Sequence, residues 1–408
     1  MRATLTILLS IAALLLAGPW AGRSPAQGGS PGVGQASATR TVTDMRGKIV
    51  ELPEDPKRVA TIDDGFVEAV MTHLGVADKV AAIASWSLKR EYRYDYGTIS
   101  GETYEYAGLN TMKYLHPWLD RLPCFNSPQG DILNFEALAK AEPDLVILRV
   151  GDCTVGDSET EKAQGTIETI EALGIPILVI YAPSFFHTAG LSTMGDEMRV
   201  IGEAFGKRDE AVALWDYLAS IEAMAKDRVK GIPDGSKARV AYLGLNPDLR
   251  KRGAMAAVFG TNTPESYVIE SLANAKNAFR GKGHAVPLNL EKLYVLDPDV
   301  IILPTYNGYH PPRELYEAPY FEDLSYLKAI RDRRVFSLPW TPMNCARRLE
   351  YPIDILITAK AAYPEAFRDF LLKDFVLGFY QRLYGVDMAT AEGLKGTQLL
   401  GWTDEYGF

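Results

Sequence analysis

The stretch LNFEALAKAEPDLVIL, from Leu133 to Leu148, decides the fold because it has a second copy, LNLEKLYVLDPDVIIL, from Leu288 to Leu303. The copies start 155 residues apart and agree at eight aligned positions. Each predicts a short helix that begins after an Asn, whose side chain can accept hydrogen bonds from the first turn. Each continues through Pro-Asp into an unbroken apolar strand, typical of parallel sheets buried on both faces. The sequence therefore predicts two helix-covered α/β lobes.

Polar and aromatic residues follow the predicted strands in both lobes. Ligands of open parallel sheets bind beyond the carboxyl ends of the strands, so two such edges predict a ligand cleft between the lobes. Aromatic side chains supply rigid contact area and Arg supplies a fixed fork of donors, a combination that suits a bulky ligand with an anionic rim. The candidate ligand-binding residues are Trp86, Arg149, Cys153 and Tyr181 in the first lobe and Tyr306, Asn307, Tyr309, His310, Trp340, Asn344, Cys345 and Arg347 in the second.

The arginines have structural alternatives. Arg149 ends a buried strand, where an unpaired charge is costly, so an ion pair with a local acid such as Asp152 competes with ligand binding. Arg347 and Arg348 can instead cap the helix that follows or lie in water. We expect at least one of these two in the cleft, because guanidinium groups prefer planar anionic partners.

The cysteines leave three alternatives open. Cys153 and Cys345 follow strands of opposite lobes, so together with His310 they could hold a soft metal. No metal-ligand spacing such as CxxC or HxxxH occurs in the sequence, however. A Cys124–Cys153 disulfide would be natural in an oxidising compartment, and inert buried thiols are the third alternative.

The N-terminal residues predict export. Arg2 precedes an apolar run that is too short to span a bilayer, and small residues follow, so residues 1–26 are expected to be a signal peptide cleaved near Ala26. Residues 27–39 are rich in Gly, Ser and Ala and predict a disordered linker. The net charge of −9, without Lys/Arg tracts, argues against nucleic-acid binding. We expect a periplasmic monomer.

The rest of the chain divides into three predicted parts: an N-terminal lobe over residues 40–206, a linker helix over 207–231, and a C-terminal lobe with C-terminal helices over 232–408. The linker helix is predicted from apolar residues that recur at helical spacing between Asp209 and Val229. A polar, Tyr-rich insertion between Trp86 and Gln129 interrupts the first lobe. Connections of that length are usually functional or mobile.

These features carry a family resemblance. With TVTDMRGKIVELPEDPKRVATID from Thr41 to Asp63, the doubled motif and the linker helix, residues 41 to about 370 resemble the periplasmic substrate-binding proteins of ABC importers for iron-siderophores, haem and cobalamin. The resemblance implies capture of a metal chelate between two lobes, little hinge motion, and delivery to an inner-membrane permease with its ATPase. It implies no catalysis and no cofactor. It also implies that an acid on the opening helix of each lobe docks on the permease. Glu68 lies on this helix in the first lobe. The corresponding helix of the second lobe offers Glu265 and Glu270 in a register that departs from the family pattern, and we expect Glu270 to have the docking role.

Two rival functions remain open. The first is a receptor of the same fold for a small oxyanion such as molybdate or tungstate, held by Arg149 and Arg347. The second is a periplasmic enzyme that uses Cys153 or Cys345 as a nucleophile, which would need a base and an orienting acid nearby. No GxSxG or HExxH motif accompanies these cysteines.

Overall fold

The computed structural model describes residues 38–128, 132–151, 154–155, 160–186, 190–306, 308–341 and 348–408. Residues 38–408 form one compact unit. The signal peptide predicted for residues 1–26 lies outside the described residues, as does the predicted linker except for its end, where Thr39 already belongs to a strand. No helix of the described ranges has both the length and the apolar character to cross a membrane.

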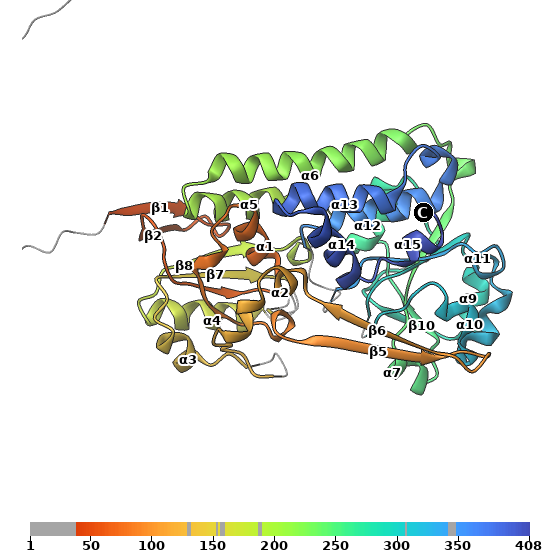
Figure 1. Cartoon of the computed structure of the whole chain (residues 1–408), viewed down its shortest axis with the longest axis horizontal. Helices are drawn as coiled ribbons and strands as arrows, with labels where there is room; N and C mark the ends of the chain where they lie inside the picture. Colours follow the sequence, from red (N-terminus) through yellow and green to blue (C-terminus); the bar gives the residue numbers. More distant parts are fainter. Residues whose placement is uncertain are drawn as a thin grey trace, which may run out of the picture. The chain divides into compact units, whose positions relative to one another are not determined.

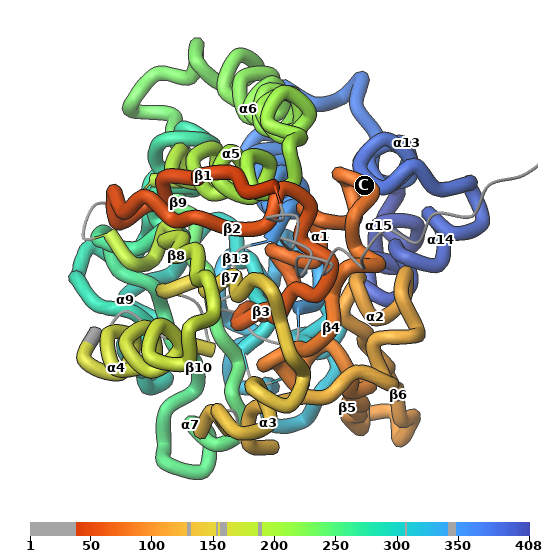
Figure 2. Tube along the Cα trace, turned by 90° about the vertical axis from the view of Figure 1, so that its left-hand side faces the viewer, coloured from red at the N-terminus to blue at the C-terminus, as the bar shows by residue number. Residues whose placement is uncertain are grey.

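The N-terminal sheet has four strands in the order β4-β3-β7-β8. All of them are parallel, which confirms the parallel sheet that the sequence predicts. Figures 1 and 2 show it lying between α1 and α5 on one side and α3 and α4 on the other, which explains why every residue of β3 is buried. The antiparallel hairpin β1–β2 precedes it and turns at Gly47, whose φ of 78° favours glycine. The bounds are β1 Thr39–Thr43, β2 Ile49–Pro53, β3 Val59–Ile62, α1 Phe66–His73, β4 Val80–Ile83, α3 Phe135–Lys140, β7 Leu145–Val150, α4 Thr160–Ala172, β8 Ile177–Tyr181 and α5 Thr193–Ala204.

The C-terminal sheet has the order β12-β10-β9-β13-β14, with β11 paired to β9. It is mixed rather than parallel throughout, because β10 and β12 run antiparallel to their neighbours. The connection from β9 to β10 contains only the five-residue helix α7, and a parallel crossover usually needs a longer one. The bounds are β9 Arg239–Gly244, α7 Pro247–Lys251, β10 Ala256–Val258, α8 Pro264–Tyr267, β11 Lys276–Asn277, β12 Val286–Leu288, α9 Leu290–Leu296, β13 Val300–Leu303, α10 Glu314–Glu317, α11 Lys328–Arg331 and β14 Val335–Ser337.

The doubled motif forms the same structure twice. Asn134 caps α3 by accepting from the amide of Ala137, and Asn289 caps α9 by accepting from the amide of Lys292. After each helix the chain turns through a residue with positive φ, 45° at Glu142 and 30° at Asp297. The predicted helix-turn-strand element is therefore confirmed in both copies.

The Pro-Asp pair of each copy joins the helix end to the neighbouring strand. Asp144 accepts a hydrogen bond from the amide of Arg58 at 3.0 Å, and the aligned Asp299 accepts one from the amide of Arg239 at 2.8 Å. The side chains of these two arginines donate in turn to backbone carbonyls at the end of the preceding helix. The motif is thus a structural device that sets each strand beside its neighbour.

The linker helix is observed as α6, Arg208–Val229, and its buried face contains the apolar residues that predict it. Figure 1 shows α6 running alongside α5 and the C-terminal helices. Those helices also contact the N-terminal part of the chain, where His73 Nδ1 lies 2.7 Å from the carbonyl oxygen of Leu383. Their bounds are α12 Tyr351–Ala362, α13 Leu372–Tyr384, α14 Met388–Thr397 and α15 Trp402–Glu405.

The Tyr-rich insertion forms a second antiparallel hairpin, β5 Glu91–Gly97 and β6 Thr103–Leu109, followed by the short helix α2, Thr111–Leu115. Figure 1 shows the hairpin leaving the N-terminal sheet and ending near α10, in the C-terminal part of the chain. At its tip the amide of Ile99 donates to the carbonyl of Glu317 at 2.8 Å. The hairpin is therefore a second connection between the two sheets besides α6.

Candidate ligand site

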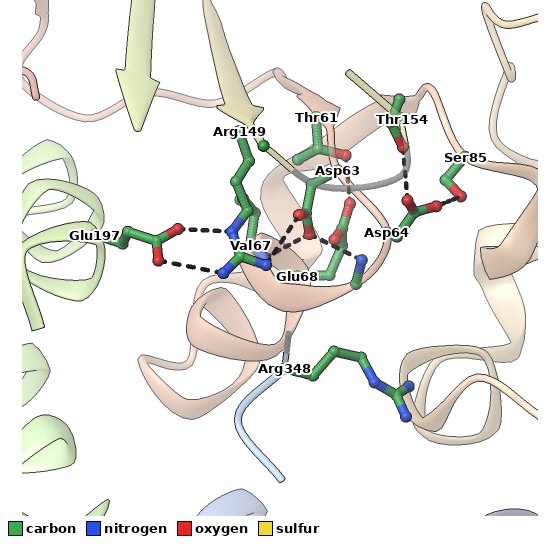
Figure 3. Close-up of polar contacts among 12 residues, drawn as sticks. Thr61, Asp63, Asp64, Val67, Glu68, Ser85, Arg149, Thr154, Glu197 and Arg348 are labelled. Carbon is green, nitrogen blue, oxygen red and sulfur yellow. Dashed lines mark hydrogen bonds and ion pairs between the residues drawn. The ribbon is translucent and has the colours of Figure 1, made fainter. Parts of the chain in front are cut away.

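At the carboxyl edge of the N-terminal sheet, Arg149 is fully buried at the end of β7. Its Nε donates to Glu197 Oε2 at 2.6 Å and its Nη2 to Glu197 Oε1 at 3.2 Å. Asp63 Oδ1 lies 3.7 Å from Nη1 (Figure 3). The central carbon of the guanidinium lies 3.9 Å from the centroid of the Phe66 ring. The Arg149 side chain is therefore fully buried in contacts within the fold. The ion-pair alternative is seen for Arg149 with Glu197 as the acid, while Asp152, the acid named as a possible partner, lies outside the described residues.

Three more buried carboxyl groups lie near this ion pair, those of Asp63, Asp64 and Glu68. Asp63 accepts from the amides of Gly65 and Val67 at 2.8 and 2.9 Å and so holds the start of α1. Asp64 accepts from Thr154 Oγ1 at 2.9 Å and from Ser85. Burial raises the pKa of Asp64, and it raises the pKa of Glu197 to about 7 although Arg149 opposes the shift. At this edge the fold itself thus supplies a hydrogen-bonded counter-charge for Arg149.

Both residues expected to dock on a permease have other contacts. Glu68 is 1% exposed, its carboxylate accepts from Thr61, and burial raises its pKa well above the usual value. In this conformation Glu68 cannot present a carboxylate to another protein, which corrects the expectation for that residue. Glu270 lies at the surface with its side chain 33% exposed and forms an ion pair with Arg280. Its docking role stays a prediction.

The carboxyl edge of the C-terminal sheet contains a cavity of about 50 Å³. Arg348 lines it and is 4% exposed. Its Nη2 donates to Gln398 Oε1 at 2.8 Å and to the carbonyl of Trp340 at 3.3 Å, while its Nε lies 4.0 Å from Glu350 Oε2. Other residues that line the cavity follow β13 and β14 or begin α12: Pro304, Thr305, Leu338, Thr341 and Tyr351.

Two predicted site residues of the second lobe, Trp340 and Tyr309, lie against the Tyr-rich hairpin, and a third, His310, pairs with α10. The ring of Trp340 is 5.4 Å from that of Tyr92, and the ring of Tyr309 is 5.1 Å from that of Tyr106. His310 is buried and its Nδ1 lies 2.8 Å from Glu314 Oε2. The Tyr-rich hairpin thus covers Trp340 and Tyr309, which the sequence predicts to line an open cleft.

The remaining described candidates are half-buried aromatics at strand ends. The Trp86 indole donates to the carbonyl of Asn126 at 3.0 Å. Tyr181 stacks on Phe185 with ring centroids 4.1 Å apart. Tyr306 packs so closely on Gly244 that a β-carbon there would lie 2.9 Å from its ring, which explains the glycine. Trp86, Tyr181 and Tyr306 each keep part of their surface accessible.

Cys153, Asn307, Asn344, Cys345 and Arg347 lie outside the described residues, so their predicted roles stay predictions. Cys124 is a free thiol, and burial raises its pKa. The alternative of a Cys124–Cys153 disulfide also involves Cys153, which lies outside the described residues. Across the described ranges, no cluster of three or more His, Cys, Asp or Glu residues could hold a metal ion.

Sequence reasoning missed Glu197 and the Arg348–Gln398 contact. Glu197 had a local signal, since it is an acid on the buried face of α5 between Met194 and Met198. The second contact joins residues 50 positions apart and left no such signal.

Comparison with known proteins shows which family and which solved structures this chain is similar to. Residues 64–340 match the family profile described as periplasmic binding protein. A periplasmic solute binding protein from Veillonella parvula aligns with TM-score 0.66 and 22% identity, covering 91% of this chain and 100% of that one. The molybdate-bound MolA of Haemophilus influenzae aligns with TM-score 0.62 and 19% identity, covering 85% and 98%. A periplasmic haem-binding protein from Pseudomonas aeruginosa aligns with TM-score 0.53 and 18% identity, covering 76% and 94%.

A comparison with curated protein sequences found no significant match. The solved structures share too little identity to carry more than the fold. The family profile spans more than half of the chain, from Asp64 to Trp340. The chain therefore belongs to the periplasmic binding protein family.

Proposed function

We propose that the protein captures a metal chelate of the ferric siderophore, haem or corrinoid type and delivers it to an inner-membrane permease with its ATPase. The observation that carries the proposal is the set of half-buried aromatic rings at the sheet edges: Trp86 and Tyr181 at one, Tyr306 at the other. Ligand sites for bulky molecules are lined mainly by apolar and aromatic groups with a few fixed polar ones. A small ion does not need a binding site lined by aromatic rings.

The arginines favour the same cargo. A free oxyanion held by Arg149 would have to displace Glu197 from two short contacts in a fully buried pair. Arg348 lies at the carboxyl edge of the C-terminal sheet. In the sequence it closely follows three candidates that lie outside the described residues, Asn344, Cys345 and Arg347. These three keep their proposed ligand-binding roles.

A small oxyanion is the second candidate. It is favoured by one observation, the fold likeness to a protein whose structure contains molybdate. The likeness to a haem-binding protein supports the chelate to a similar degree. Because the chain belongs to a family of solute-binding proteins, an enzyme with a cleft cysteine is not proposed again.

The test is calorimetry of the purified protein against ferric siderophores, haemin, corrinoids, molybdate and tungstate. We expect a chelate to bind with a Kd of about 1 µM or tighter, corresponding to about −8 kcal/mol. The change Tyr306→Ala should weaken that binding by up to about tenfold through lost ring contact. The matched change Tyr326→Ala removes a ring that is 72% exposed and should have no effect. Binding of molybdate or tungstate alone would reject the chelate.

A further inference from the structure

A second cavity, of about 200 Å³, is lined by residues of the Tyr-rich hairpin, of the loop after β13 and of the C-terminal helices α14 and α15. Two pairs of aromatic rings contribute to its walls. The rings of Tyr106 and Tyr309 lie 5.1 Å apart at an angle of 60°. Those of Trp402 and Tyr406 lie 5.8 Å apart at 68°. The half-buried rings that support the chelate proposal do not line this cavity, so it is a separate candidate site.

The charged residues at this cavity favour a cation. Glu405 and Arg313 both line it and form an ion pair, with Arg313 Nη2 3.1 Å from Glu405 Oε2. The central carbon of the Arg313 guanidinium also lies 4.5 Å from the centroid of the Tyr104 ring, so this cation already has an acid and an aromatic face. Burial raises the pKa of Tyr309 well above its usual range, and Glu405 and Glu314 act in the same direction. Both acids therefore contribute negative potential at Tyr309.

The size of the cavity limits what can enter. A cavity of about 150 Å³ in another protein binds benzene, so about 200 Å³ suits a group of roughly six to eight non-hydrogen atoms. A whole metal chelate does not fit. Gly396 and Gly401 also line the cavity, and a β-carbon at either would have no atom within 4 Å. Open space beside these two glycines gives a small molecule a way in.

The occupant must use both the aromatic walls and the negative potential. A neutral ring would contact the walls but gain nothing from the acids, and a small hydrated cation would gain nothing from the walls. The faces of Trp and Tyr rings attract cations, and quaternary ammonium groups are the cations that sites of several such rings recognise. We propose that this cavity binds the quaternary ammonium group of a small molecule. Its methyl groups contact the four rings, and its charge is balanced by Glu405.

Choline and 3,3-dimethylbutan-1-ol test this with the purified whole protein. The alcohol has the shape of choline with a carbon in place of the nitrogen, so it lacks only the charge. Titration calorimetry should show choline binding with a Kd of about 0.1–1 mM, as expected for so few atoms. The alcohol should bind at least about tenfold more weakly, because it loses the attraction between a desolvated cation and the ring faces. No choline binding, an alcohol that binds as well as choline, or tighter binding of phenol would overturn the proposal.

A change of one ring assigns the binding to this cavity. Tyr406→Leu removes a ring that is 40% exposed, so the fold should tolerate the change while choline binds at least fivefold more weakly. Tyr326→Leu is the control, because Tyr326 is 72% exposed and does not line the cavity. Melting curves verify that both variants are folded. Unchanged choline affinity in folded Tyr406→Leu would overturn the proposal.

A change of one acid tests the charge and still decides if Tyr406→Leu does not fold. Glu405→Gln keeps an acceptor for Arg313 but carries no charge, so choline should bind at least fivefold more weakly while the affinity for the alcohol stays the same. General damage to the cavity would weaken both. Asp404→Asn is the matched control, because Asp404 is 58% exposed and pairs with Lys395. Equal losses of choline and alcohol affinity in Glu405→Gln, or equal choline affinities in the two variants, would overturn the proposal.

This site and the proposed chelate site are tested separately. A protein that binds choline and no chelate would reject the proposed function and leave the ammonium site. A protein that binds a chelate and no choline would reject the ammonium site and leave the proposed function.

Discussion

The carboxyl edges of the two sheets each bury one arginine, and the two arginines are satisfied in different ways. Arg149 has a bidentate acid on a neighbouring helix, a second acid at 3.7 Å and an aromatic ring against its face. Arg348 has neutral acceptors for Nη2, and its counter-charge, Glu350, lies 4.0 Å from Nε without a hydrogen bond between them. Position at a strand end is therefore a poor guide to ligand binding. What distinguishes the two edges is whether the fold binds the guanidinium to its counter-charge through hydrogen bonds.

The largest effect on stability is expected from removing the acid that pairs with Arg149 at the carboxyl edge of the N-terminal sheet. Glu197→Ala leaves the charge of Arg149 buried without its bidentate partner, so the free energy of unfolding should fall by about 3–5 kcal/mol. Denaturant unfolding measures this. The control is Asp196→Ala on the same helix, whose acid is 61% exposed and contacts Arg199 at 3.7 Å, and it should cost less than about 1 kcal/mol. Equal effects of the two changes would mean that the buried pair contributes no more than a surface one.

The pH dependence of stability tests whether Glu197 is buried beside Arg149. Burial raises the pKa of Glu197 from 4.5 to about 7, so between these values the folded protein binds more protons than the unfolded chain. The Glu197 contribution to stability is therefore full below pH 4.5 and falls as the pH rises towards 7, by up to about 1.4 kcal/mol per pH unit. Unfolding measured from pH 5 to 8 should show a less negative slope for Glu197→Gln than for the wild type. Parallel curves would contradict the assignment.

The Tyr-rich hairpin covers Trp340 at the carboxyl edge of the C-terminal sheet. Loosening this hairpin should have a smaller effect on the free energy of unfolding. Tyr92→Ala removes the ring that contacts Trp340, which should reduce stability by about 1 kcal/mol and speed amide exchange in β5 and β6. Arg93→Ala, on the exposed face of β5, is the control. Exchange that is equally slow in both variants would show that the ring contact does not hold the hairpin down.

The smallest effect is expected in the spacing of the two sheets. They are joined by α6, by the tip of the hairpin at Glu317 and by the contact between His73 and Leu383. Solution scattering with and without cargo should therefore give nearly superimposable profiles. A change of several ångströms in the radius of gyration would contradict this.

The parts of the fold that sequence reasoning recovers are those decided by local chemistry. The Asn caps, the Pro-Asp pairs and the apolar strands of the doubled motif need only neighbouring residues, and so does the apolar face of α6. The mixed C-terminal sheet was missed because β10 and β12 are three-residue strands, too short to show a period. The Tyr-rich hairpin had a usable signal, since its tyrosines alternate along both strands.

The candidate site was harder to predict, because it depends on contacts between distant residues. Arg149 was correctly placed at a buried strand end, but its partner lies 48 positions away on another helix. Trp340 and Tyr309 were placed in a cleft because nothing local indicates that Tyr92 and Tyr106 cover them. Burial of Glu68 likewise follows from packing around Thr61 and not from its position on α1.

Native mass spectrometry of the protein purified from its own host, combined with its absorption spectrum, tests most directly that the two sheet edges hold a metal chelate. The account predicts an adduct with the mass of an organic metal complex, with visible absorption, that is lost in Arg348→Lys and retained in Arg313→Lys. A protein without an adduct, or one that carries only molybdate or tungstate, would contradict it.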